Sequence, residues 1–140
     1  MDNTTRTLAN YVAGLKLADL SPSALHETKR RLIDAIGCGI GGYSNEPASI
    51  ARQMAAENSG QPPARLLGSG ALTSIEMATF ANSVMVRYLD CNDTYVSKGS
   101  GHPSDMIAAS LAMADAFHVD GKNTLLSIAT AYEVYTALAD

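Results

Sequence analysis

Most of the side chains that could carry out chemistry lie in one polar stretch, residues 90–105. Within these sixteen residues the sequence places three carboxylates, a histidine and a lysine. The segments on either side are rich in alanine and mostly uncharged, as expected of structural helices. Functional side chains commonly lie on loops that rigid elements hold in place. We therefore expect the polar stretch to form the functional site.

Asp90 and His102 are the acid–base candidates within this stretch. Removing a proton from a carbon next to a carboxylate, or expelling a hydroxyl, needs a base and an acid on opposite sides of a substrate, typically a carboxylate and an imidazole. A helix that starts near Pro103 would also offer free amides and the positive end of its dipole to an anionic substrate. Caps of helices and a structural histidine are the alternative interpretation of the same residues.

The rest of the sequence predicts an all-α helical bundle of about six helices with short connections. Ser21-Pro22 is typical of a helix start, and Thr73-Ser74-Ile75-Glu76 matches a capping box. Asn123 is the expected N-cap of the last helix. Apolar residues at helical spacing predict helices over residues 5–17, 22–40, 46–57, 75–88, 104–117 and 124–139, and residues 64–67 could form a short extended piece.

Gly37, Gly39 and Gly42 match the spacing of a dinucleotide-binding fingerprint. That fingerprint follows a strand, whereas a helix is expected here. We therefore interpret the glycines as positions where another helix approaches closely and where this helix ends. Cys38, which lies among them, is expected to be a small buried residue.

Composition excludes several classes of protein. At 140 residues and 46% hydrophobic, the chain has the size of one domain, and its net charge is −4. The basic residues are scattered, so no nucleic-acid partner is expected. No apolar run approaches the roughly 20 residues that span a bilayer, and the N-terminus has no signal-peptide pattern, so we expect no membrane partner and a cytoplasmic location. The two cysteines give neither a disulfide framework nor metal-ligand spacing.

Two motifs in and beside the polar stretch carry a family resemblance. Leu89-Asp90-Cys91-Asn92-Asp93-Thr94, followed by Gly101-His102-Pro103-Ser104-Asp105, resembles the MmgE/PrpD family of 2-methylcitrate dehydratases and cis-aconitate decarboxylases. The resemblance implies a much longer homodimeric enzyme with a large helical domain and a smaller α/β lid, and with no metal or cofactor. Residues 1–140 would then be part of the N-terminal helical domain, without the lid.

The resemblance also implies roles for individual residues. Asp90 and His102 would be catalytic, and Thr94 would position the substrate or form a hydrogen bond with Asp90. Asp93, which matches a second acid of the family motif, and Ser104 are also expected to bind a polycarboxylate substrate. Lys98 departs from the family pattern: it either faces the carboxylates of the substrate or is a solvated loop lysine.

The expected reaction is the elimination of water from 2-methylcitrate or a similar hydroxy-polycarboxylate. Asn92 and the insert at residues 95–101 look more like the dehydratase branch than the decarboxylase branch. The alternatives are decarboxylation of cis-aconitate, epimerisation of a related acid, or a short non-catalytic helical module that dimerises or binds a partner. Because few cationic groups lie near the polar stretch, we expect the chain to be inactive alone.

Overall fold

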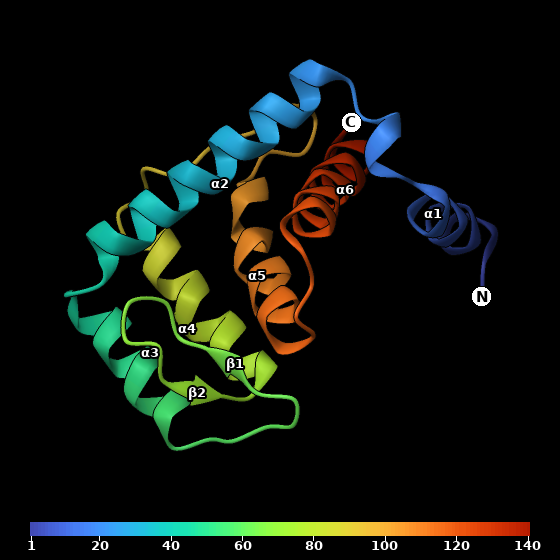
Figure 1. Cartoon of the computed structure of the whole chain (residues 1–140). Coiled ribbons are helices and arrows are strands. Elements are labelled where there is room, and N and C mark those ends of the chain that lie inside the picture. The colour runs from blue at the N-terminus through green and yellow to red at the C-terminus, as the bar shows by residue number, and fades with distance from the viewer.

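The computed structural model describes residues 1–140 and confirms the all-α fold (Figure 1). A two-residue antiparallel pair of strands, β1 (Ala64–Arg65) and β2 (Leu72–Thr73), is the only sheet. Two short 3₁₀ turns, η1 (Leu17–Asp19) and η2 (Pro103–Met106), precede α2 and α5. The helices are α1 (Asn3–Gly14), α2 (Pro22–Gly42), α3 (Glu46–Ala56), α4 (Ile75–Arg87), α5 (Ile107–Ala116) and α6 (Gly121–Ala139).

Helix α4 lies at the centre of the bundle and packs against α2, α3 and α5. Helix α6 packs beside α2 and α5, and its C-terminal end lies close to the beginning of α2 (Figure 1). Helix α1 lies apart from the other five and has no buried residue. Five of the six predicted helices therefore build the core, and the first is peripheral.

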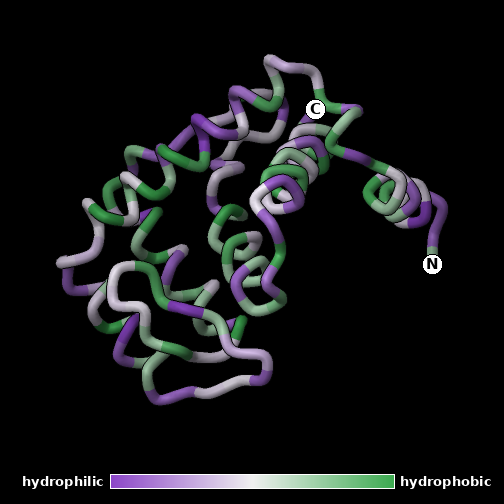
Figure 2. Tube along the Cα trace, in the orientation of Figure 1, coloured by the Kyte–Doolittle hydropathy of each residue, from purple (hydrophilic) through white to green (hydrophobic).

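Small side chains let these helices approach closely. One core cluster contains seven alanines, which come from α3, β1, α4 and α5. The second joins α2, α4, α5 and α6 through Ala35, Cys38, Val86, Ile107 and Ile128. Hydrophobic residues predominate along α5, whereas α2 alternates between hydrophilic and hydrophobic residues (Figure 2). This difference fits an α5 that packs against α4, α6 and β1 and an α2 with one face exposed.

The end of α2 at Gly42 is a packing site, as predicted, whereas a Cβ atom on Gly37 would meet nothing within 4 Å. A Cβ atom on Gly42 would lie 2.1 Å from the main-chain oxygen of Met85 on α4, so only glycine fits there. Gly37, Gly39 and Gly42 all lie within the helix, and no strand precedes them. Cys38 is buried between the helices, also as predicted, and burial raises the pKa of its thiol.

Helix starts were predicted with mixed success. Ser21 caps α2 with Pro22 in the first turn, as expected. The predicted cap of α4 was wrong by one residue: Ser74 accepts the hydrogen bond from the Met77 amide. The hydroxyl of Thr73 instead donates to the main-chain oxygen of Ala55 at 2.6 Å, which connects β2 to α3.

The starts of the last two helices also differ from the prediction. Asp120, rather than Asn123, caps α6, because its carboxylate accepts from the Asn123 amide at 2.8 Å. Helix α6 therefore begins at Gly121, one turn earlier than expected. The segment that starts at Pro103 is first a 3₁₀ turn and becomes α-helical only at Ile107. None of the helices has the length and apolar character needed to cross a bilayer.

Candidate active site

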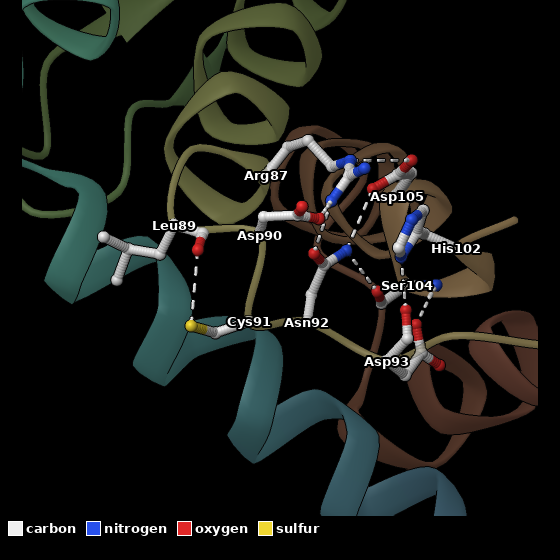
Figure 3. A network of polar contacts seen from close by, with 9 residues as sticks. All are labelled: Arg87, Leu89, Asp90, Cys91, Asn92, Asp93, His102, Ser104 and Asp105. Atoms are coloured by element: carbon white, nitrogen blue, oxygen red, sulfur yellow. Dashed lines mark hydrogen bonds and ion pairs between the residues drawn. The ribbon is translucent and has the colours of Figure 1, made fainter.

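The polar stretch connects α4 to η2 and α5 and passes beside α6 (Figures 1 and 3). It begins with a sharp turn after α4, in which the amide of Asp90 donates to the main-chain oxygen of Arg87 at 3.0 Å. Asp90 has a φ of 52°, a left-handed conformation that aspartate adopts more readily than most residues. This turn brings the Asp90 carboxylate back over the last turn of α4, next to the Arg87 guanidinium.

Arg87 connects three acceptors at this end of the stretch (Figure 3). Its Nη1 atom donates to the carboxylate of Asp90 and, at 3.1 Å, to Oδ1 of Asn92. Its Nε atom lies 3.9 Å from a carboxylate oxygen of Asp105. The hydrogen bond and charge of Arg87, with a smaller contribution from His102, hold the pKa of Asp90 below its usual value. Asp90 is therefore a carboxylate whose side chain is still 73% exposed and free to meet a ligand.

Asn92 ties the first half of the stretch to the second. Its side-chain amide nitrogen donates to the hydroxyl of Ser104 at 2.8 Å and to Asp105 at 3.1 Å. Asn92 is 5% exposed and Ser104 1% exposed. All polar atoms of the Asn92 amide thus have partners inside the chain, which fixes the two halves of the stretch against each other.

The His102 side chain is held by one hydrogen bond to the main chain. Its Nδ1 atom lies 2.6 Å from the main-chain oxygen of Asp93. A carbonyl oxygen can only accept, so Nδ1 carries a proton and, in the neutral ring, Nε2 is left with a lone pair. The backbone of His102 is extended, as expected for a residue before proline.

The carboxylate of Asp93 has two partners within the chain. One oxygen accepts from the Ser104 amide at 3.1 Å, and the other accepts from the hydroxyl of Tyr132 on α6 at 2.7 Å. The amide at the start of η2 is therefore already paired, in contrast to the expectation of free amides there. The structure places Asp90, Asp93, His102 and Ser104 around this network.

Thr94 and Lys98 lie outside the network. Thr94 is exposed and forms no hydrogen bond with Asp90, one of the two roles expected of it. Tyr95 and Gly101 pair across a small antiparallel turn that contains Lys98. The Lys98 ammonium donates to the main-chain oxygen of Asp140, after the end of α6. Lys98 therefore contacts the end of α6 rather than the residues around Asp90.

An open depression of about 450 Å³ adjoins the network. Ser83, Val84, Arg87, Tyr88 and Asp105 line it. A depression of similar size, about 470 Å³, lies between α2 and residues 67–68, but it contains no charged residue and no residue of the polar stretch. The depression beside the network is the better candidate for a substrate with several carboxylates, because Arg87 lies in its wall.

Sequence reasoning missed Arg87 and Tyr132 as parts of the site. Arg87 could have been found, since a basic residue in the last turn of a helix commonly pairs with acceptors beyond its end. Tyr132 gave no such signal, because it lies 39 residues from Asp93 and only the fold brings them together. No group of three His, Cys, Asp or Glu side chains is placed to hold a metal ion, and the absence of a metal or cofactor stays a prediction.

Comparison with known proteins shows a family match over nearly the whole chain. Residues 6–140 match the model of the MmgE/PrpD N-terminal domain. A 2-methylcitrate dehydratase of Cupriavidus necator is 31% identical over 112 residues, which are 79% of this chain and 23% of that protein. Human cis-aconitate decarboxylase is 28% identical over 143 residues, or 96% of this chain and 28% of that protein. The probable 2-methylcitrate dehydratase of Saccharomyces cerevisiae is 28% identical over 115 residues, which cover 81% and 22% of the two chains. The chain thus spans about a quarter of the length of these curated relatives.

Proposed function

Because the chain belongs to the MmgE/PrpD family, we propose that it supplies the Asp90–His102 half of the active site of a lyase that removes water from 2-methylcitrate or a similar hydroxy-polycarboxylate. The observation that supports this most is the pairing of one ionised carboxylate with one imidazole of fixed tautomer at the two ends of a single hydrogen-bonded stretch. Relatives named as dehydratases act on this class of substrate.

His102 is the proposed base. Its Nδ1 proton is engaged by the Asp93 carbonyl, so Nε2 is the atom that can take a proton from the carbon next to a substrate carboxylate. The hydroxyl that leaves needs a proton of its own, and an acid outside this chain would have to supply it. Asp90 does not suit that second task, because its ion pair with Arg87 keeps it ionised. We assign Asp90 to orienting the substrate hydroxyl, as an acceptor of its hydrogen bond.

The remaining predicted residues divide into two groups. Thr94 has an exposed hydroxyl without a partner in the chain, which suits a contact with substrate. Asp93 and Ser104 make their contacts within the chain, so we assign them to holding His102 in place. Lys98 stays a predicted substrate contact that would require the turn at residues 95–101 to leave the end of α6.

We expect the chain to show no turnover on its own. Elimination chemistry on a polyanion needs several cationic groups and exclusion of water. The depression beside Arg87 is open, and Arg87 is already shared among acidic neighbours. Further helical structure, a lid and a second subunit would have to complete the site. Homodimerisation and a cytoplasmic location remain parts of this proposal.

The test uses the polypeptide as its source cell makes it, after its intact mass has been measured. We expect this protein to convert 2-methylcitrate, and His102→Ala to reduce kcat by about 10²–10⁴-fold, the contribution of a general base. His26→Ala is the matched control, because His26 is exposed on α2, outside the network. Near-normal turnover in a folded His102→Ala protein would refute the role of His102.

Decarboxylation of cis-aconitate is the second candidate, because the match to the human decarboxylase covers almost all of the chain. Product identification separates the two reactions: dehydration keeps every carboxylate of the substrate, whereas decarboxylation releases CO₂. If the protein converts neither class of acid and associates with itself or with another protein, the non-catalytic helical module is the correct interpretation.

A further inference from the structure

Tyr132 reaches the site from α6, an element that contributes nothing else to the hydrogen-bond network around His102. Its hydroxyl donates to the second carboxylate oxygen of Asp93 at 2.7 Å. Its ring packs against the core cluster that includes Ile107 and Ile128. The hydroxyl is therefore held at a fixed position by the core of the bundle.

The surroundings of Tyr132 keep its hydroxyl protonated. Burial, and then the hydrogen bond and charge of Asp93, raise the pKa of Tyr132 far above its usual value. A phenol that keeps its proton can serve as a permanent donor to a carboxylate, and such charge-assisted hydrogen bonds are stronger than neutral ones. This contact is therefore a stable one between α6 and the polar stretch.

Asp93 transmits this restraint to His102. Its carboxylate is held on one side by Tyr132 and on the other by the Ser104 amide. The main-chain oxygen of the same residue accepts the His102 Nδ1 proton (Figure 3). With the side chain held at both oxygens, the peptide unit that follows Asp93 has little freedom to rotate, and its carbonyl stays directed at the imidazole.

We propose that Tyr132 is a positioning residue for His102, which acts through Asp93 to keep the imidazole in the tautomer with Nε2 free. This role deepens the proposed function. It rests on that function only in one respect, namely that Nε2 takes a proton from the substrate. Tyr132 need not contact substrate. Its effect is on which ring nitrogen carries the proton, a property that can be measured without turnover.

The experiment is a ¹⁵N nuclear magnetic resonance measurement of both ring nitrogens of neutral His102 in the 140-residue chain. We expect the Nδ1–H form to dominate in the native chain, and the ratio of Nδ1–H to Nε2–H to fall about fivefold in Tyr132→Phe. One hydrogen bond of about 1 kcal/mol corresponds to such a ratio. Free imidazole side chains prefer the proton on Nε2, so the loss of restraint should move the ring in that direction.

Tyr135→Phe is the matched control. Tyr135 lies one turn further along α6, and its hydroxyl reaches Gly101, next to His102: a Cβ on Gly101 would lie 1.9 Å from it. The Tyr135 hydroxyl forms no hydrogen bond within the chain, so its removal in Tyr135→Phe should leave the His102 tautomer unchanged. If Tyr132→Phe fails to fold, Asp93→Asn tests the same contact, because an amide cannot accept at both atoms.

The outcomes separate this inference from the proposed function. A native tautomer ratio in a folded Tyr132→Phe chain, or an equal change in Tyr135→Phe, overturns the inference. A shifted ratio in Tyr132→Phe alone supports it. If the ratio shifts but the native protein converts no hydroxy-polycarboxylate, the proposed function fails while the positioning role of Tyr132 stands.

Discussion

The Asp90 end and the His102 end of the polar stretch are held by different kinds of interaction. At the Asp90 end the partners are charged, and the Asp90 side chain is 73% exposed. At the His102 end the donors are an amide, a phenol and an imidazole N–H, and the neighbouring Ser104 is 1% exposed. Exposed ion pairs add little stability, whereas hydrogen bonds that are partly buried, as at the His102 end, are more costly to break.

This difference suggests a division of labour between the two ends. The Arg87 contact changes the charge state of Asp90 without burying it, so the carboxylate stays both ionised and accessible. The Asp93 contacts determine the direction and the tautomer of the His102 ring. Acid–base catalysis needs groups with a suitable charge state and also a suitable position. A proton must be within reach of its acceptor before the pKa of that acceptor matters. We therefore expect substitutions at the two ends to have separable effects.

The largest effect on stability should come from Asn92, which joins the two ends. Asn92→Ala removes the partner of the buried Ser104 hydroxyl and leaves Arg87 and Asp105 without their shared contact. We expect the free energy of unfolding to fall by about 2–3 kcal/mol, because a buried polar group is left unsatisfied. Urea denaturation followed by circular dichroism measures this loss.

Asn123→Ala is the control for that experiment. Asn123 is exposed in the first turn of α6, and its side chain forms no hydrogen bond. Its substitution should change the unfolding free energy by no more than about 0.5 kcal/mol. If Asn92→Ala were equally mild, water would replace Asn92 easily, and the two ends would not be rigidly coupled through it.

The sequence predicted those parts of the structure that depend on neighbours along the chain. Ser21 before Pro22 determines the start of α2, and the small size of Gly42 explains the contact with α4. The errors at Thr73 and Asn123 were also local: in each case two polar residues close together could cap the helix, and the fold used the other one. Thr73 was needed elsewhere, since its hydroxyl pairs with Ala55.

Contacts between residues that lie far apart in the sequence could not be predicted from local sequence patterns. Residue type and position along the chain, and then the family motif, pointed to Asp90 and His102, but nothing local shows that Asp93 pairs with Tyr132 or that Asn92 is buried. The contact of Asp93 with Tyr132 exists because α6 packs beside η2, and the packing of two elements depends on their whole surfaces. Asn92 is paired because η2 brings Ser104 and Asp105 back to it. The family resemblance could be found from the sequence, whereas the hydrogen bonds that hold each site residue in place could be found only from the structure.

A smaller effect, confined to one end, should follow from Arg87→Met. Loss of the guanidinium should raise the pKa of Asp90 toward its usual value and leave the His102 tautomer as it is. The ¹³C shift of the Asp90 carboxyl, followed through a pH titration, measures the pKa of Asp90. The ¹⁵N spectrum of the imidazole measures the tautomer of His102. Arg6→Met, which removes an exposed arginine from the peripheral α1, should change neither.

The pH dependence of stability should follow the same contact. A carboxyl whose pKa is lowered in the folded state stabilises the fold above its unfolded pKa of about 3.9, and this contribution is lost as the pH falls through the lower, folded value. The difference in unfolding free energy between native and Arg87→Met chains should therefore shrink below about pH 4. A constant difference down to pH 2 would mean that Arg87 acts through packing or through Asn92 rather than through Asp90.

Salt should have the smallest effect, and it should act on one end only. Raising the salt concentration from 0.15 to 1 M shortens the Debye length from about 8 to about 3 Å. The Arg87–Asp90 pair is exposed to solvent, so the pKa of Asp90 should rise slightly in the native chain. The contact between His102 and the Asp93 carbonyl joins two uncharged groups when the ring is neutral, so its tautomer ratio should not change. Both quantities can be followed in one sample by nuclear magnetic resonance. A tautomer ratio that moved together with the pKa of Asp90 would show that charge at one end controls geometry at the other, and the two ends would then be one coupled unit.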